Sequence, residues 1–513
     1  MRPSKILVLS ILVLLFTYCQ SAFCATYPRD VQQTLDKAGT NRAELEKVLE
    51  HYAGNPDAVL AYRAACFLIA QMPIHQSQSF YWADTLGQRL DYDEFAFPDF
   101  KSAVSRFNEL SLGANLHPVT VIANDLNTLS ATYLIQNIDK AFQLKDKPWA
   151  RNLTFEQFCE YLLPYRVMNE PCGEWRDSFH KEFAPYCDTV SSTRVRAACQ
   201  AMCTALKSWF FNTWVVSPDK VEPAYLSPSQ ILFRKQGACE DMANWGAYMF
   251  RSLGIATTID YTPAWATSTG SHYWNVSIGE HGEFIPFVMG SADSPNRFYV
   301  HREPSKVLRI TYSAQKESLA QRIPMEQIPD GHLRNANCID VTRDYWKVAP
   351  LSVTPDTMDA KKTVAYLCVL NGLSWRTVWW GALHKGVATF TDMSCGVVYL
   401  PMWYRDGALY PAASPYLLRK DGQAQVLTPD RSHLRTISLP QQEGYLIFRP
   451  SKKYVLYYWD YGWEMLGVKL ARDAKPLTFS GVPSNALLLL LPEYSQGKER
   501  PFTIDQRGER EWW

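Results

Sequence analysis

The spacing of apolar residues changes twice along the chain, and this constrains the fold more than any other feature. From about residue 25 to 215, apolar side chains recur three and four positions apart, which predicts α-helices. Between about 220 and 345, one helical segment is followed by alternating segments that are typical of strands. Beyond about 355, short strand-like runs are separated by turn residues, which predicts one or two β-sandwich modules.

The length of the chain also requires several domains. At 513 residues it is about twice the size at which a single hydrophobic core usually stops growing. We therefore expect a multidomain protein with an α-helical N-terminal region, an α+β core and a C-terminal β-sandwich region. The expected segments are a signal peptide at 1–24, the helical domain at 25–190, the core at 191–347 and the β-sandwich region at 355–513.

The N-terminus has the pattern of an export signal. A basic start is followed by the apolar run 6–16, which at 11 residues is too short to span a bilayer. Small residues follow, so we expect the mature chain to begin near Ala25 and to be periplasmic, secreted or on the outer surface. A lipoprotein acylated at Cys19 or Cys24 is the alternative. No later stretch suggests an integral membrane span, and the nearest candidate, 486–492, has the length of a strand.

Composition and motifs exclude several classes of function. The formal net charge is +1, which argues against a nucleic-acid partner. The chain has no HExxH, GxSxG, GxxxxGK or GxGxxG motif and no paired cysteines or histidines at zinc-site spacing. We therefore expect neither a metal nor a cofactor. The oligomeric state is left open.

The cysteines do not form a disulfide framework. Of the 12 cysteines, those outside the signal and position 239 are scattered without CxxC spacing. Cys172 and Cys187 could pair in an oxidising compartment. Buried free thiols are the simpler interpretation, because several cysteines lie in apolar helical patterns.

A candidate nucleophile opens the helix of the central region. Gly237 permits a tight entry to Cys239, and the apolar positions after it recur at helical spacing until Gly254 ends the helix. Unpaired N–H groups at a helix N-terminus stabilise a thiolate and can hold an oxyanion. Glu240 and its neighbour in the first turn are expected to be structural and to offset part of this stabilisation. Gln236 is either an auxiliary oxyanion donor or a solvated loop residue.

His272 is the candidate base. It begins an alternating segment after a Gly/Ser/Thr-rich loop, and it shares a strand face with Trp274, Val276 and Ile278. A histidine on such a face is usually a satisfied core residue. The helix-start cysteine 33 residues earlier favours a catalytic role.

These residues together resemble a known family. Gly-x-Cys opening a buried helix, then a strand, then His-x-Trp is similar to the core of the transglutaminase-like superfamily, which has a papain-like fold. The segments 67–75, 155–176 and 388–392 resemble large secreted transglutaminase-like proteins of gut Bacteroidetes. The resemblance implies Cys239 as nucleophile and His272 as base. Transglutaminases, cysteine peptidases, peptide N-glycanases and inactive relatives share this core, so it does not define a reaction.

The third residue of the family pattern, an aspartate on the strand after the histidine strand, is not at its expected place. A four-residue hairpin loop at 279–282 would set His272 opposite Met289, and no carboxylate lies nearby on that strand. Asp293 is the first acid beyond it, and Asn296 could supply a papain-like amide.

Two functions follow from this pattern. The first is an exported cysteine enzyme that hydrolyses or transfers an amide of a protein, peptide or glycopeptide through a Cys239 thioester. The second is a catalytically inactive scaffold that binds a peptide or glycan at the cell surface and keeps Cys239 unreactive. Tryptophans of the β region could stack on sugars, although core packing is the simpler interpretation.

Overall fold

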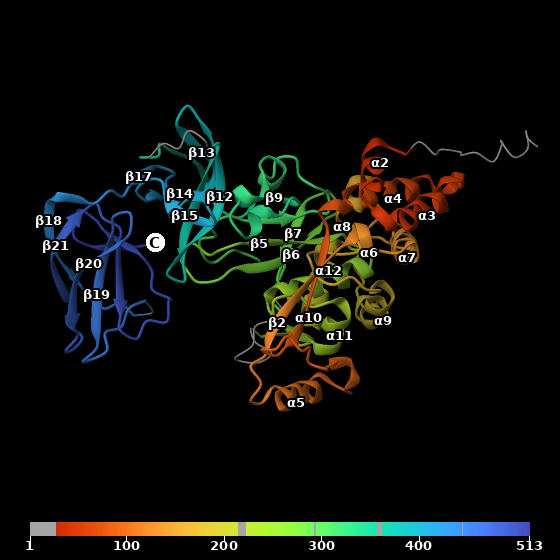
Figure 1. Ribbon diagram of the computed structural model, residues 1–513, viewed down its shortest axis with the longest axis horizontal. Helices are drawn as coiled ribbons and strands as arrows, with labels where there is room; N and C mark the ends of the chain where they lie inside the picture. Colours follow the sequence, from red (N-terminus) through yellow and green to blue (C-terminus); the bar gives the residue numbers. More distant parts are fainter. Residues whose placement is uncertain (1–26, 214–221, 292–293, 357–361, 444) are drawn as a thin grey trace, which may run out of the picture.

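The computed structural model describes residues 27–213, 222–291, 294–356, 362–443 and 445–513. The expected signal peptide and Asp293 lie outside these residues. The chain forms a helical N-terminal region, a central α+β core and a β-rich C-terminal region, which follow one another along the long axis of the molecule (Figure 1). This confirms the predicted fold class.

Helices of the N-terminal region, apart from α5, bury one shared core, which includes Leu45, Leu68 and Ile138. Its helices are α2 (Arg29–Leu35), α3 (Arg42–Ala53), α4 (Val59–Gln71), α5 (Phe100–Ser111), α6 (Asp125–Thr128), α7 (Ala131–Gln143) and α8 (Phe155–Tyr161). Short 3₁₀ turns lie at Gly39–Asn41, Pro56–Ala58, Met72–Ile74 and Glu94–Ala96. Several helix termini are capped by local side chains, as where Thr154 and Gln157 cap α8 reciprocally.

A β-hairpin interrupts this region, which the sequence pattern had predicted as helical. Strands β1 (Gln76–Ala83) and β2 (His117–Asn124) pair antiparallel, and α5 lies in the connection between them (Figure 1). Within the described part of the chain, β1 and β2 form a two-stranded sheet of their own. Most of their residues are half-buried or exposed, so the sequence lacks the alternation that marks a strand with one buried face.

One helical run is long and apolar enough to cross a membrane by length and composition alone, contrary to the expectation from the sequence. It covers Pro56–Ile74 and includes α4. Within it, Ala64, Leu68 and Ile69 are buried in the core of the helical region. Most of the other residues of the run are half-buried or exposed, so one side of α4 packs in this core.

A five-stranded antiparallel sheet forms the middle of the core, in the order β7-β6-β5-β8-β9. The strands are β5 (Thr257–Thr262), β6 (His272–Ile278), β7 (Phe284–Phe287), β8 (Leu308–Ile310) and β9 (Cys338–Asp340). The helices are α9 (Arg176–Cys187), α10 (Val195–Ala205), α11 (Pro228–Arg234) and α12 (Cys239–Ser252), and β3 (Phe211–Asn212) pairs with β4 (Gln236–Gly237). Further 3₁₀ turns lie at Leu319–Gln321, Met325–Gln327, His332–Arg334 and Thr342–Asp344.

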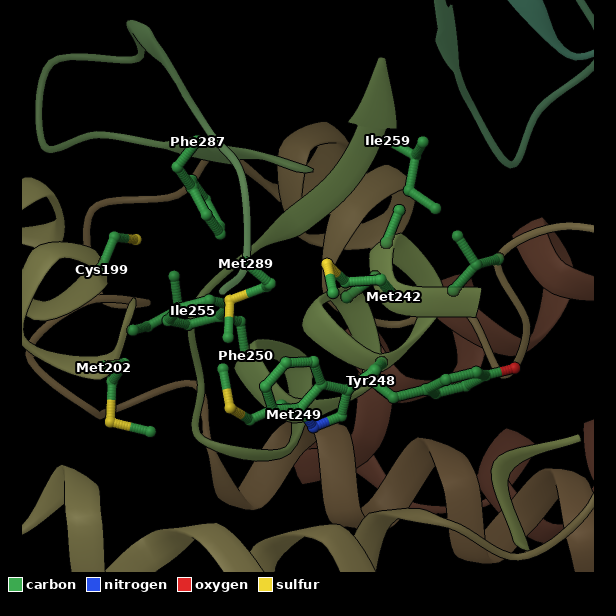
Figure 2. Close-up of a cluster of buried hydrophobic side chains, with 14 of the residues drawn as sticks. Cys199, Met202, Met242, Tyr248, Met249, Phe250, Ile255, Ile259, Phe287 and Met289 are labelled. Atoms are coloured by element: carbon green, nitrogen blue, oxygen red, sulfur yellow. The ribbon is translucent and has the colours of Figure 1, made fainter. Parts of the chain in front are cut away.

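Helix α12 covers one face of this sheet. Figure 2 shows its side chains, among them Met242 and Phe250, facing Ile259 of β5 and Phe287 of β7 in a buried hydrophobic cluster. Asn275 of β6 donates its amide N–H to the carbonyl of Ala243 on α12 at 2.7 Å. Helix α9 packs on the other side of α12 and belongs to the same buried cluster. The helix that carries Cys239 is therefore held from both sides.

The C-terminal region consists of antiparallel sheets with their own cores. An eight-stranded sheet has the order β10-β13-β12-β11-β14-β16-β17, with β15 paired to β14. Its strands are β10 (Val348–Val353), β11 (Val364–Asn371), β12 (Ser374–His384), β13 (Val387–Ser394), β14 (Val397–Arg405), β15 (Ala408–Pro411), β16 (Tyr416–Leu418) and β17 (Ala424–Val426). Trp403 and Trp459 are buried in this region, as core packing requires.

The last strands form a pair, β18-β21, and a five-stranded sheet in the order β20-β19-β22-β23-β24. They are β18 (Asp430–Leu439), β19 (Lys453–Trp459), β20 (Trp463–Leu470), β21 (Leu477–Ser484), β22 (Leu488–Pro492), β23 (Phe502–Ile504) and β24 (Arg510–Trp512). The eight-stranded sheet is joined to the core by Lys306, whose buried ammonium donates to the carbonyls of Thr391 and Asp392 and contacts Asp340.

Candidate functional site

Local backbone geometry places Cys239 at the first position of α12, as the sequence predicts. Helix α11 ends in the left-handed residue Lys235, and β4 then pairs with β3 to lead the chain into α12. Asp241 folds back over Gly237, so that a Cβ at this glycine would lie 2.8 Å from the Asp241 Cβ. A residue without a side chain is required there.

Asp241 is a structural group of this entry. Its carboxylate accepts the backbone N–H groups of Ala238 at 3.0 Å and Leu226 at 2.9 Å. The first contact satisfies a donor at the helix N-terminus, and the second holds the segment before α11. Burial raises the pKa of Asp241 to about 6, against the opposing effect of these backbone bonds.

The surroundings of Cys239 favour the neutral thiol. The residue is 3% exposed, and its Sγ lies 3.2 Å from the Glu240 Oε2. Burial raises the pKa of Cys239 well above its ordinary value, and the charge of Glu240 and the hydrogen bond to it raise it further. Backbone N–H groups of Tyr273 and Glu240 act in the opposite direction but are outweighed. The predicted offset by first-turn acids is therefore present at Glu240, and the neutral thiol donates a hydrogen bond to that carboxylate.

Replacing Glu240 with glutamine is expected to speed alkylation of Cys239. The variant removes a like charge beside the thiolate, so the fraction of thiolate at pH 8 rises and the rate with iodoacetamide increases by roughly tenfold. Peptide mass spectrometry measures the rate. The half-buried Cys338 of the same protein is the internal control and keeps its rate. An unchanged rate at Cys239 would show that Glu240 does not control this thiol.

His272 lies on the opposite face of the sheet from Cys239. Strand alternation turns Asn275 and Tyr273 of β6 towards α12, whereas His272 and Trp274 face away from it. The Tyr273 ring stacks on Tyr261 of β5 at a centroid distance of 5.0 Å. Among the described residues, no contact joins the His272 ring to Cys239. The catalytic roles assigned to the pair stay predictions, and the two side chains are not brought together here.

An aromatic pocket surrounds the His272 ring. The ring stacks on Trp265 at a centroid distance of 6.0 Å and lines a cavity of about 310 Å³ with Trp274, Phe298 and His301. Burial lowers the pKa of His272 to about 4, and electrostatic interactions with the nearby His301 and Arg302 contribute. The imidazole is therefore neutral near pH 7.

The expected register beside His272 was wrong by one residue. Ile278 pairs with Phe284, and Gly279 donates its N–H to the Glu283 carbonyl, so the hairpin loop has three residues rather than four. Continuing this register sets His272 level with Gly290 instead of Met289. The Met289 side chain lies in the cluster under α12, where its sulfur is 3.8 Å from the Cys203 sulfur.

The remaining candidates are not gathered around the His272 ring. Asp293 lies outside the described residues. Asn296 is exposed, and its backbone N–H donates to the Gln200 side chain on α10 at 3.3 Å. Gln236 is half-buried in β4, three residues before Cys239. The third catalytic residue stays a prediction.

Sequence reasoning missed a cluster of tyrosines on the Cys239 side of the sheet. Tyr225 and Tyr273 share a side-chain hydrogen bond, and the Tyr261 hydroxyl meets the Cys338 sulfur at 3.4 Å. These three tyrosines line a cavity of about 350 Å³ together with Val167, Met168, Asn169, Ile310, Gly331, His332, Asn335, Asn337 and Cys338. Successive side chains of a strand point to opposite faces of the sheet, so the sequence alone places Tyr261 and Tyr273 on the face opposite to that of the residues next to them in β5 and β6. That signal could have identified them.

One comparison with known proteins, the match to a family model, agrees with this core. Residues 189–287 match the model of the transglutaminase-like superfamily. No curated protein matches the chain. A solved transglutaminase of red sea bream aligns with 88% of this chain and 77% of its own at 10% identity, with a TM-score of 0.21, too low to carry an argument. By the family match, the chain carries a domain of the transglutaminase-like superfamily at residues 189–287.

Proposed function

We propose that the transglutaminase-like domain of this chain is a binding module for a peptide or glycan, without a working Cys239–His272 pair. The observation that carries the proposal is the position of the two side chains. The Cys239 thiol donates to Glu240 on one side of the sheet, and the His272 ring stacks against Trp265 on the other.

Acyl transfer by a cysteine requires a thiolate and a base within hydrogen-bond reach of it. Burial and Glu240 raise the pKa of Cys239, which disfavours the thiolate at neutral pH. The group that the β6 strand offers to the sulfur is the Tyr273 backbone N–H, which cannot accept a proton. The domain therefore keeps the framework of its family while its thiol is held in an unreactive state.

The tyrosine-lined cavity is the binding site in this proposal. It lies beside Tyr273 and between the helical region, the sheet and the segment 331–338. Tyrosine rings offer stacking surfaces with a polar end, and the amides of Asn335 and Asn337 offer both donors and acceptors. Burial lowers the pKa of His332, another residue of the lining, to about 4, so it is neutral near pH 7. Such a lining suits a neutral chain of sugars or peptide groups.

A cysteine-dependent amide hydrolase or acyltransferase is the second candidate. Its support is the position of Cys239 at the start of the 14-residue helix α12 in a transglutaminase-like domain. Catalysis would require a rearrangement that breaks the contact with Glu240 and brings a base to the sulfur. Export to the cell surface, as the N-terminal pattern predicts, suits both candidates.

Binding by the full chain to a panel of peptides and oligosaccharides tests the proposal by isothermal titration calorimetry. For a ligand that binds, Asn335→Ala is expected to weaken the affinity about fivefold, the effect of losing one hydrogen bond. Asn296→Ala, at another exposed asparagine outside the cavity, is the matched control and leaves the affinity unchanged. Cys239→Ala also keeps the affinity. Turnover of an amide substrate that disappears in Cys239→Ala would instead establish the second candidate.

A further inference from the structure

The aromatic pocket around the His272 ring, which we call the His272 cavity, contains polar side chains that the protein itself does not pair. Its volume is about 310 Å³, and its lining includes His272, Arg297 and His301. Among the described residues, the side chains of these three form no hydrogen bond and no ion pair. All three are at least partly exposed, and the ring nitrogens of His272 remain accessible.

His272 differs in this respect from the other two histidines of the described chain that are not exposed. The His75 ring bonds to the carbonyl of Tyr312 at 2.8 Å, and the His332 ring bonds to the carbonyl of Val378 at 3.0 Å. Polar groups that are partly withdrawn from water usually have a hydrogen-bond partner. The accessible imidazole of His272 therefore has donor and acceptor capacity that a ligand can use.

Aromatic rings form most of the walls of the cavity. Trp265 stacks on the His272 ring at a centroid distance of 6.0 Å and lies 6.1 Å from the His301 ring. Phe298 is half-buried in the lining. At the rim, Tyr299 is 73% exposed and lies against His301 at a centroid distance of 6.2 Å. An exposed aromatic ring beside a cavity offers a flat apolar surface to a bound ring.

The charges at the cavity favour an anion over a cation. The lining includes Arg297 and, among its described residues, no acid. Arg302 adds a second guanidinium close enough to act electrostatically on His272. Glu303 lies outside the lining and accepts the Thr267 hydroxyl at 2.7 Å. Two guanidinium groups repel a cation, so the aromatic walls do not serve as a cage for an ammonium group.

The mixture of groups fits one six-membered sugar ring that carries a carboxylate. A volume of about 310 Å³ is near the lower end for ligand pockets and suits a single ring. One face of a pyranose consists of C–H groups, which can pack on Tyr299, while its hydroxyls need partners such as the His272 imidazole. A carboxylate can accept two N–H groups from the Arg297 guanidinium. An aromatic acid would leave the imidazole unpaired.

We propose that the His272 cavity binds a uronic-acid sugar, whose carboxylate pairs with Arg297, whose ring lies against Tyr299 and whose hydroxyls bond to His272. This site is separate from the tyrosine-lined cavity, because the two linings share no residue. His272 also faces away from α12, whereas Tyr273 faces towards it. The inference therefore goes beyond the proposed function and does not depend on it.

Calorimetric titration of the full chain with sodium methyl β-glucuronide tests the site, with methyl β-glucoside and sodium benzoate compared at the same ionic strength. Saturable binding is expected for the glucuronide. The glucoside lacks the carboxylate and is expected to bind about fivefold more weakly. Benzoate keeps the carboxylate but lacks the hydroxyls, and it is also expected to bind about fivefold more weakly.

Variants of exposed residues locate the sugar. Arg297→Gln is expected to weaken glucuronide binding about fivefold, to roughly the affinity of the glucoside, because it removes the partner of the carboxylate. Arg151→Gln, at an exposed arginine outside the cavity, is the matched control and leaves the affinity unchanged. Tyr299→Ala is expected to weaken both sugars about threefold by removing a packing surface. Asn335→Ala, in the tyrosine-lined cavity, should leave glucuronide binding unchanged.

Absence of saturable glucuronide binding to the wild type would overturn the proposal. So would equal affinity for the glucuronide and the glucoside, or tighter binding of benzoate than of the glucuronide. A loss of glucuronide affinity in Asn335→Ala but not in Arg297→Gln would place the sugar in the tyrosine-lined cavity. That result would support the proposed function and overturn the present inference.

Discussion

Replacing Arg309 with methionine is expected to lower the free energy of unfolding of the core by about 3–5 kcal/mol, because a buried charge loses its partner. Arg309 donates to both carboxylate oxygens of Asp260 at 2.8 Å, and the two side chains are 2% and 0% exposed. Tyr345 also donates to Asp260. Urea denaturation of the full chain measures the loss in the free energy of unfolding. Hydrogen exchange in peptides that cover β5 and β8 measures the same loss within the core sheet.

Two controls separate the charge effect from lost packing. The double variant Asp260→Asn/Arg309→Met removes the stranded carboxylate and is expected to recover part of the stability. Arg106→Met breaks an exposed pair with Glu109 and should leave the midpoint unchanged. A loss below about 1 kcal/mol in Arg309→Met would mean that the pair does not hold the sheet as described.

Replacing Gly246 with valine is expected to destabilise the core by about 3 kcal/mol, the sum of overpacking and a lost buried hydrogen bond. A Cβ at this position would lie 2.3 Å from the Asn275 Oδ1 and 2.8 Å from the Met289 Cγ. Asn275 would have to release the Ala243 carbonyl, and α12 would move away from β6.

The same substitution at an open glycine provides the comparison. Gly54 follows the last residue of α3, and a Cβ at this position would meet no atom within 4 Å, so Gly54→Val should change stability little. Thermal unfolding of both variants measures the difference. Equal midpoints would contradict the close packing of α12 on β6, on which the geometry of Cys239 depends.

Local signals in the sequence sufficed for the elements that carry the site. Gly237 and Gly254 bracket α12 because the first allows a close approach by Asp241 and the second adopts a left-handed backbone just after the helix. The effect of Glu240 on Cys239 was also predictable, since the two residues are adjacent. Such features depend on neighbours along the chain, which a sequence pattern contains.

Long-range packing was not predictable in the same way. Alternation placed His272 on the face of Trp274, but it could not indicate that α12 covers the other face. That choice depends on the fit between Gly246 and Asn275, residues that are far apart in sequence. The register error at the β6–β7 hairpin came from expecting one residue too many in the loop. A shift of one residue moves every side chain of the second strand to the other face of the sheet. The hairpin of β1 and β2 lacked a buried face and therefore a pattern.

The pH dependence of iodoacetamide alkylation at Cys239, with His272→Ala beside the wild type, tests the separation of the two residues most directly. Because burial and Glu240 raise the pKa of this thiol, the rate should stay low through neutral pH and rise only above the roughly 8.5 of a free cysteine. His272→Ala should leave that profile unchanged. A fast reaction with an apparent pKa well below that of a free cysteine, lost in His272→Ala, would establish an activated pair and contradict the proposed binding role.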